Sequence, residues 1–268
     1  MGRYKLLGCK ILEREIASIV YNCKNVIDVT LLRQKLHDRP DNLREALQNE
    51  IDELERNNHR YSNDTKVNDF DAILLGYGLC SNATVGLHSN KYPLVVPRAH
   101  DCITLFMGSK EKYADYYDTH KGFFYYTPGF VEIGYPDDDA VWDRRYQMYL
   151  TRYKGSEKKA RRAVEIEKSF TDSYQGFTYI KWEDLSFPEY ENAIQELAGE
   201  KGWKFDAVLG KNTILRKLVD GMWSEEEFLV VPPGYQVVAS YDKEIIKAEN
   251  YRENSEMYRH DNMIKNYK

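Results

Sequence analysis

The first half of the chain alternates short apolar runs with stretches in which apolar residues recur at helical spacing. Four runs rich in β-branched residues or leucine have the length and composition of strands: Tyr4–Gly8, Val26–Leu32, Asp71–Leu75 and Tyr92–Val96. Three stretches show the periodicity of an amphipathic helix: 11–20, the segment that begins at Asp41, and 101–117. This order predicts a mainly parallel sheet with helices on both faces.

The second half continues the alternation. Further strands are expected at 123–127, 177–182, 205–209 and 228–231, and helices at 139–153, 156–171, 190–198 and 213–221. The last 25 or so residues are polar, which favours a helical tail. The expected organisation is therefore a first α/β unit over 1–120, a second over 121–240 and a tail over 241–268.

Two sequence blocks recur at a constant offset. FDAIL at 70–74 returns as FDAVL at 205–209, and LVVP at 94–97 returns at 229–232, in both cases 135 residues later. An ungapped repeat of this kind favours an internal duplication into two tandem Rossmann-like units. Chance similarity between apolar strands is the alternative reading.

Composition excludes several classes of protein. The 268 residues contain 38 Lys and Arg against 43 Asp and Glu, a net charge of −5, so a dominant nucleic-acid-binding face is not expected. No stretch approaches the ~20 apolar residues of a membrane span, and the start lacks a signal-peptide pattern. These features predict a cytoplasmic protein. The tyrosine-rich helices leave a homodimer as an option.

Three of the four cysteines follow predicted strands. Cys9 ends the first strand, Cys80 closes the GYGLC segment, and Cys102 closes PRAHDC. Because the carboxyl ends of parallel strands share one edge of a sheet, we expect these thiols to converge. The chain has no CxxC pair, so metal ligands, nucleophiles or core residues are expected in place of disulfides. Cys23, near the end of a helix, is expected to be a buried small residue.

Three convergent thiolates can hold a metal and leave one coordination position open. Zinc would carry water or substrate there, and a [4Fe–4S] cluster would keep one iron free as a Lewis acid. The sequence lacks the closely spaced pairs of structural zinc sites, and cysteines dispersed over strand ends are similar to those of cluster-dependent hydrolyases and desulfidases, so we place the cluster ahead of zinc. Gly76 and Gly78 let the backbone turn tightly beside the bound group and are the candidate cofactor-binding positions. The alternative is three unrelated core cysteines.

Polar residues beside the cysteines are candidates for catalysis. Arg98 could bind an anionic group of the substrate or lower the pKa of a thiol. His100 could transfer protons or supply a fourth ligand, and Tyr77 could donate a proton or a hydrogen bond. Asp101 either joins the site or caps the helix that follows it.

These same motifs carry a family resemblance. The stretches GYGLCSNATVGL, PRAHDCITLFMGSKEKY and FFYYTPGFVE resemble the domain-of-unknown-function family numbered 1638, over a core from about 6 to 132. The resemblance puts the three cysteines and the Arg-Ala-His-Asp block on matching positions. Members are similar in occurring in anaerobes, often beside corrinoid-dependent methyltransferase genes, which implies one-carbon or methylamine-type metabolism. The DTHKG segment at 118–122 is one residue short of the corrinoid motif DxHxxG, so we expect a loop there.

Three functions follow from these residues. The leading hypothesis is an enzyme that acts on a small polar or anionic molecule at a metal held by the three cysteines. The second is an accessory protein that delivers a metal, a cluster or a corrinoid to a methyltransferase partner. The third is a metal-free enzyme with Cys80 or Cys102 as the nucleophile, activated by Arg98 or His100.

Overall fold

The computed structural model describes residues 1–34, 36, 39–56, 69–133, 139–171 and 173–251. The chain forms two compact units, one made of 1–110 with 211–268 and the other of 111–210. The polypeptide thus leaves the first unit and later returns to it. The sequence pattern predicts boundaries after 120 and 240, with no such return.

A five-stranded sheet forms the centre of the first unit. Its strand order is β2 (Val26–Leu32), β1 (Arg3–Cys9), β3 (Ala72–Gly76), β4 (Leu94–Pro97) and β8 (Phe228–Val231). The first four strands are parallel, and β8 pairs antiparallel with β4. Strands β3 and β4 are buried along their whole length, as strands covered on both faces should be. The predicted α/β class is confirmed.

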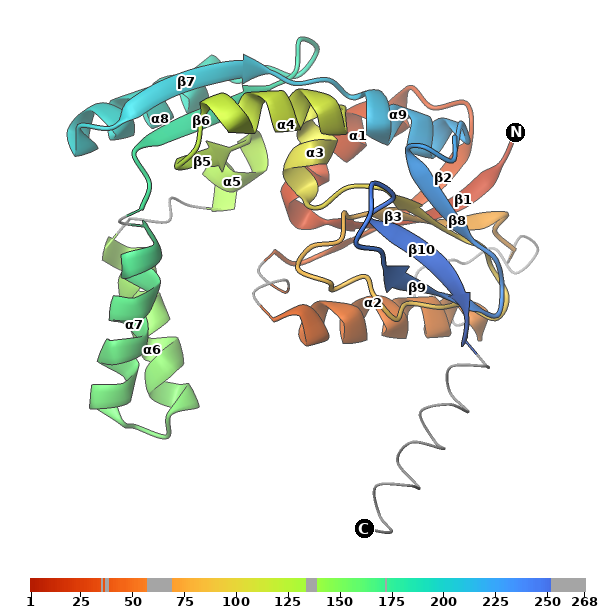
Figure 1. Cartoon of the computed structure of the whole chain (residues 1–268), viewed down its shortest axis with the longest axis horizontal. Helices are drawn as coiled ribbons and strands as arrows, with labels where there is room; N and C mark the ends of the chain where they lie inside the picture. Colours follow the sequence, from red (N-terminus) through yellow and green to blue (C-terminus); the bar gives the residue numbers. More distant parts are fainter. Residues whose placement is uncertain (35, 37–38, 57–68, 134–138, 172, 252–268) are drawn as a thin grey trace. The chain divides into compact units, whose positions relative to one another are not determined.

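Helices lie on both sides of this sheet (Figure 1). Helices α1 (Glu13–Tyr21) and α9 (Thr213–Asp220) lie on one side, and α2 (Pro40–Glu55) lies on the other. The 3₁₀ turn η1 (Lys10–Leu12) leads from β1 into α1. Helix α2 buries a single apolar stripe, made of Leu43, Leu47, Ile51 and Leu54. This spacing of three to four residues places all four side chains on one face of the helix.

The helix expected over 101–117 is interrupted at Gly108. The structure has α3 (Cys102–Met107) and α4 (Lys110–Thr119), and Gly108 between them has a φ of +82°. A Cβ atom at this position would lie 2.5 Å from the carbonyl oxygen of Lys211. The left-handed backbone and this close approach both require glycine, and together they end the helix.

The second unit contains a three-stranded parallel sheet. Its strand order is β5 (Phe123–Tyr126), β6 (Gly176–Lys181) and β7 (Lys204–Leu209), and it is accompanied by α5 (Pro128–Ile133) and α8 (Pro188–Lys201). The core contains residues from β5, β6 and α8: Tyr126, Phe177, Tyr179, Ile194 and Ala198.

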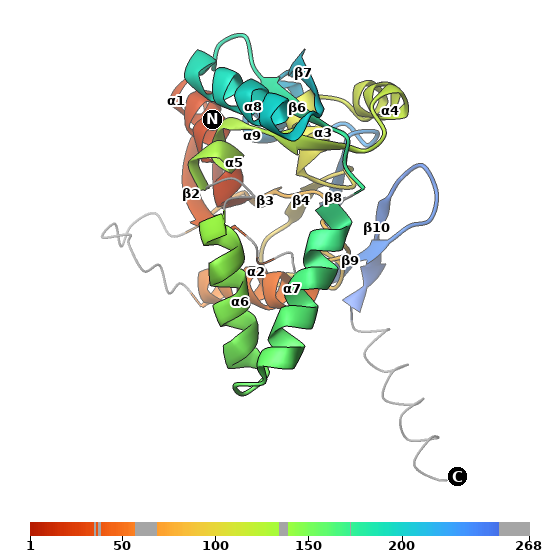
Figure 2. The same ribbon diagram turned by 90° about the vertical axis from the view of Figure 1, so that its left-hand side faces the viewer.

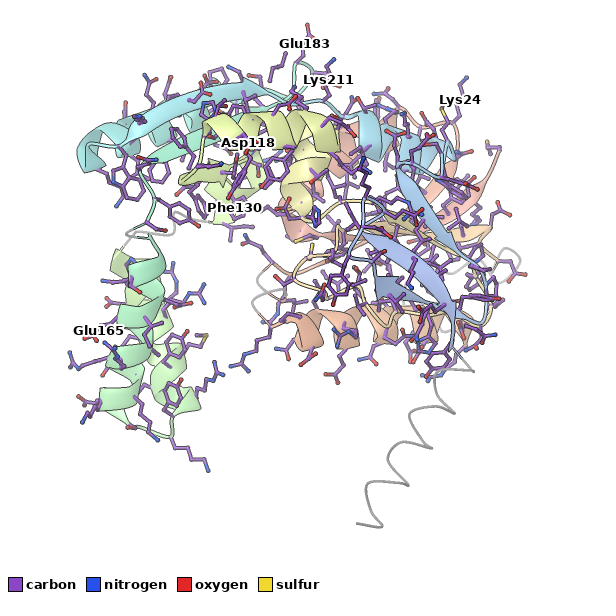
Figure 3. The ribbon with its side chains drawn as sticks, in the orientation of Figure 1. Lys24, Asp118, Phe130, Glu165, Glu183 and Lys211 are labelled. Carbon is purple, nitrogen blue, oxygen red and sulfur yellow. The ribbon has the colours of Figure 1, made fainter. Side chains whose placement is uncertain are left out.

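Helices α6 (Asp139–Arg152) and α7 (Glu157–Thr171) pack against each other as a hairpin (Figure 2). The charged face of α7 is exposed, and ion pairs join Arg161 to Glu157 and Arg162 to Glu165. The side chain of Glu165 extends outward from α7 (Figure 3). This arrangement is that of a solvated helix face.

The tandem Rossmann-like duplication is not confirmed. The two FDA(I/V)L blocks fall on β3 and β7, which belong to different units. The two LVVP blocks fall on β4 and β8, which pair with each other in one sheet. Because the repeated blocks do not occupy equivalent places in two separate units, the constant offset does not correspond to a repeated fold.

The first unit ends with a hairpin. Strands β9 (Tyr235–Ala239) and β10 (Ile246–Asn250) pair antiparallel. The prediction of a helical tail from residue 241 onward is therefore wrong at 246–250, which form β10. Residues 252–268 of the expected tail lie outside the described residues. None of the helices in the described ranges has the length and hydrophobicity to cross a membrane.

Candidate three-cysteine site

Three parallel strands bring Cys9, Cys80 and Cys102 to one edge of the sheet. Cys9 is the last residue of β1, Cys80 lies in the loop after β3, and Cys102 opens α3 after β4. All three thiols act electrostatically on the hydroxyl of Tyr77, and Cys9 acts on both Cys80 and Cys102. The structure therefore brings together the three cysteines that the sequence placed at strand ends.

The Tyr77 hydroxyl is buried among these thiols. The Tyr77 side chain is 3% exposed, and its oxygen has no hydrogen-bond partner among the described residues. Burial, with the three neighbouring thiols, raises the pKa of Tyr77, so the hydroxyl keeps its proton. A buried hydroxyl without a partner costs roughly 1–3 kcal/mol. A ligand held by the thiols could accept the hydrogen bond that the protein leaves unmade.

The three thiols are protonated near neutral pH. Burial raises the pKa of the Cys80 thiol to about 12. Burial also raises the pKa of Cys102 well above its ordinary value, and that of Cys9 to a smaller extent. A nucleophilic cysteine needs the opposite shift, because the thiolate is the reactive form. A bound metal cation would displace these protons, since metal binding and thiol ionisation are coupled.

Cys80 belongs to a left-handed turn that the sequence pattern does not predict. Cys80, Ser81 and Asn82 have φ values of +46°, +58° and +66°, and the amide of Ala83 donates to the carbonyl of Cys80. Left-handed backbone costs a residue with a side chain roughly 1–2 kcal/mol. Such strain persists only where the surroundings impose it, and it concentrates at functional sites. No motif in the sequence marks this turn.

Backbone hydrogen bonds join the loop after β3 to the loop after β4. The amide of Leu79 donates to the carbonyl of Ala99 over 2.7 Å. A Cβ atom on Gly78 would lie 2.7 Å from the same Ala99 oxygen and 2.9 Å from the amide of Asp101. Gly78 therefore permits the close approach of the two loops. Gly76 has a related role within the sheet, because a Cβ there would lie 3.2 Å from the Cα of Gly8 on β1.

Arg98 was expected to bind an anionic group, but in the structure its side chain binds backbone carbonyls. Its Nε donates to the carbonyl of Glu225 over 2.7 Å, and its Nη1 donates to the carbonyls of Glu244 and Ile246. The side chain is buried, and its acidic partner among the described residues is Glu244, at 3.8 Å. These contacts tie the end of β4 to the segment before β8 and to the β9–β10 hairpin. Arg98 thus stabilises the fold through backbone carbonyls.

His100 and Asp101 follow Arg98 in the same loop. The carbonyl of His100 accepts a hydrogen bond from the amide of Cys80, and the residue as a whole is exposed. The Asp101 carboxylate caps α3, because its Oδ1 accepts from the amides of Ile103 and Thr104. Of the two roles considered for Asp101, the structure shows the cap. The same carboxylate contributes to the raised pKa of both Cys80 and Cys102.

The remaining sequence candidates lie elsewhere. The Cys23 thiol is half-buried and donates to the Val219 carbonyl, which links the end of α1 to α9. His120, in the near-miss corrinoid motif, stacks on Tyr116, and its Nε2 lies 3.2 Å from Asp206. Its Nδ1 contacts the carbonyl of Tyr116. Because both ring nitrogens have protein partners, this histidine is not presented as a cobalt ligand.

The described ranges contain no ready-made metal site. No group of three or more His, Cys, Asp or Glu side chains there lies together in a geometry that could hold a metal ion. The three thiols interact with one another and with Tyr77, but they do not form a preassembled single-ion site.

The fold and the site define a mixed α/β protein with three thiols at the carboxyl edge of its parallel strands. A family model described as a protein of unknown function, DUF1638, matches residues 31–219. The match spans more than half of the chain, so the chain belongs to this family. No curated protein and no solved structure matches it.

Proposed function

We propose that Cys9, Cys80 and Cys102 hold a metal centre with one open coordination position, at which a small polar molecule is bound and activated. One observation carries this proposal: three neighbouring thiols, that of the buried Cys9 and those of the half-buried Cys80 and Cys102, act on a buried hydroxyl, that of Tyr77, which has no partner among the described residues. Three thiol ligands leave a fourth position free, which is the pattern of catalytic metal sites.

The favoured centre is a [4Fe–4S] cluster, with zinc as the alternative. The ligands come from three separate strand ends and include no closely spaced pair. A cluster takes its thiolates on separate irons, so ligands dispersed over an edge suit it. Either group would act as a Lewis acid on a hydroxyl, thiol or water placed at its open position.

The Tyr77 hydroxyl has a defined part in this proposal. It is neutral and buried, so it would donate a hydrogen bond to the molecule at the open position or to a sulfur of the centre. His100, exposed in the adjacent loop, is the candidate for exchanging protons with solvent. Because Arg98 is engaged with backbone carbonyls, we do not assign it to the recognition of an anionic group.

The raised thiol pKa values disfavour the metal-free alternative. An activated cysteine nucleophile requires a lowered pKa, whereas burial raises the pKa of Cys80 to about 12. The guanidinium of Arg98, which could have supplied the activating charge, donates to carbonyls of the fold.

Strictly anaerobic purification with metal and sulfide analysis tests the proposal. About four irons with matching sulfide per chain, and a broad absorbance near 400 nm, would support the cluster; one zinc without sulfide would support zinc. Cys9→Ser, Cys80→Ser and Cys102→Ser should each lower the metal content sharply, whereas Cys23→Ser should not. A wild-type protein that holds neither metal after reconstitution with iron and sulfide or with zinc would refute the proposal.

A further inference from the structure

The left-handed turn of Cys80, Ser81 and Asn82 requires a restraint from outside the loop. Its three residues all carry side chains, so the turn is unfavourable by itself. Two hydrogen bonds to the neighbouring loop fix its entrance, from the amides of Leu79 and Cys80. These bonds do not act on its exit, where the chain passes Asn82.

At the exit, the amide of Val85 donates to the carbonyl of Asn82 over 3.2 Å within the loop, and the side chain of Arg44 supplies the restraint from outside it. Arg44 lies on α2, and its Nη2 donates to the carbonyl of Asn82 over 2.9 Å. Its Nε donates to the carbonyl of Val85 over 2.5 Å. The Nη1 of Arg44 forms an ion pair of 2.8 Å with Asp41, one turn earlier on the helix, and this pair helps to orient the guanidinium. One side chain therefore bonds the end of the strained turn and the residue three positions later.

Local geometry fits an arginine in particular. Nε and the Nη atoms donate from a rigid planar fork, so one guanidinium can satisfy two carbonyls in fixed relative positions. Gly86, next to Val85, has a φ of +89°, and a Cβ on it would lie 3.6 Å from the Cδ of Arg44. A lysine could reach one of the carbonyls but has no second donor fixed in the same plane.

We propose that Arg44 is the positioning residue of the three-cysteine site. It holds the turn of residues 80–82 in its left-handed form and so keeps the Cys80 thiol beside Cys9, Cys102 and Tyr77. The metal-binding consequence rests on the proposed function, whereas the placement of the thiol does not. The restraint comes from the helix on one face of the sheet and acts on the loop at the edge of the sheet.

Thiol alkylation of the metal-free protein tests the placement directly. Iodoacetamide labelling at each cysteine would be followed by peptide mass spectrometry in wild type, Arg44→Lys and Arg44→Ala. We expect the labelling rate of Cys80 to rise at least tenfold in both variants, while that of Cys23 stays within twofold. Arg56→Ala is the matched control. Arg56 lies at the C-terminal end of α2 and, like Arg44, pairs with an acidic residue three positions earlier, Glu53, but contacts no carbonyl of the turn in the hydrogen bonds described.

A second substitution, to glycine, should reverse the effect of Arg44→Ala on Cys80 labelling. Asn82→Gly removes the steric cost of the left-handed backbone, so Arg44→Ala combined with Asn82→Gly should return Cys80 labelling to within about threefold of wild type. A general loosening of the protein would raise labelling at Cys23 as well and would not respond to this glycine. If Arg44→Ala does not fold, the same comparison of Cys80 labelling is made with Arg44→Lys, with and without Asn82→Gly.

Two results would overturn the proposal: Cys80 labelling unchanged in Arg44→Lys and Arg44→Ala, or an increase that Asn82→Gly does not reverse. The outcomes also separate this inference from the proposed function. If wild type binds no metal but Arg44 controls Cys80 labelling, the metal centre fails and the positioning role stands. If wild type binds metal but Cys80 labelling is unchanged in the Arg44 variants, the positioning role fails and the metal centre stands.

Discussion

The amide nitrogen of Cys80 donates a hydrogen bond to the carbonyl oxygen of His100 over 2.9 Å. This bond joins the loop that carries one thiol to the loop that leads into Cys102, so the two cysteines are held by a shared backbone contact. The spacing of the candidate ligands therefore depends on how closely the two loops approach each other.

Gly78→Ala should separate these loops. The added Cβ would lie 2.7 Å from the carbonyl oxygen of Ala99, which is backbone and cannot rotate away. Overpacking of this kind costs roughly 1–3 kcal/mol, and we expect a lower midpoint of urea unfolding together with a lower metal content. Gly199→Ala, in α8 with no atom of the described part of the chain within 4 Å of its Cβ position, is the control and should be neutral or slightly stabilising. Equal midpoints for the two variants would contradict the prediction.

Arg98→Met should destabilise the fold without a specific effect on a ligand. The substitution leaves the carbonyls of Glu225, Glu244 and Ile246 without their charged donor. Hydrogen bonds to charged groups contribute about 1.5–3 kcal/mol each, and the bonds of one side chain are not additive, so we expect a loss of roughly 2–5 kcal/mol in the free energy of unfolding. Amide exchange in β9 and β10 should accelerate at the same time.

Arg162→Met is the control for Arg98, because Arg162 is 71% exposed on α7. We expect its free energy of unfolding to stay within about 0.5 kcal/mol of wild type. An Arg98 variant as stable as this control would show that the three carbonyls are satisfied without the guanidinium.

The metal-free protein should lose stability as the pH rises through the alkaline range. The Cys80 thiol has a pKa of about 12 in the folded chain, against about 8.5 in an unfolded one. The folded state thus favours the neutral thiol, and the stability that this provides is complete below the unfolded pKa and is lost as the pH rises towards 12. Urea unfolding from pH 8 to 11 should show a shallower pH slope for Cys80→Ser than for wild type. An unchanged slope would refute the burial of this thiol.

Tyr116→Phe should weaken the second unit. The Tyr116 hydroxyl donates to the Asp206 carboxylate over 2.6 Å and lies 3.0 Å from the Thr178 hydroxyl. Burial and the bond to Asp206 raise the pKa of Tyr116, so this donor stays protonated. We expect a loss of roughly 1–3 kcal/mol in a thermal unfolding experiment. Tyr117→Phe, on the same helix with its side chain 48% exposed, should have almost no effect.

The strands could largely be predicted, because each apolar run has to be buried somewhere. The sequence did not reveal that β8 returns to pair with β4 in the opposite direction, since this depends on contacts between distant segments. The break at Gly108 has a similar origin, because the carbonyl that excludes a side chain there belongs to Lys211. The two LVVP blocks suggested a repeat because both are apolar strands, whereas the structure pairs them with each other in one sheet.

At the site, the location of the three cysteines followed from strand ends, because parallel strands share an edge. The roles of the arginines could not be predicted, since their partners are backbone carbonyls. Arg98 reaches carbonyls as far as Ile246, and Arg44 reaches Val85. A carbonyl leaves no mark in the residue pattern, so an arginine that holds backbone has the same sequence signature as one that binds an anion.

The return of the chain to the first unit has a consequence for its biosynthesis. Strand β8 completes the sheet beside β4, but residues 111–210 are made in between and form the second unit. During translation the edge of β4 stays unpaired until the segment around Phe228 has left the ribosome. An exposed strand edge invites pairing with other chains, so the nascent protein passes through a long interval in which aggregation competes with completion of its own sheet.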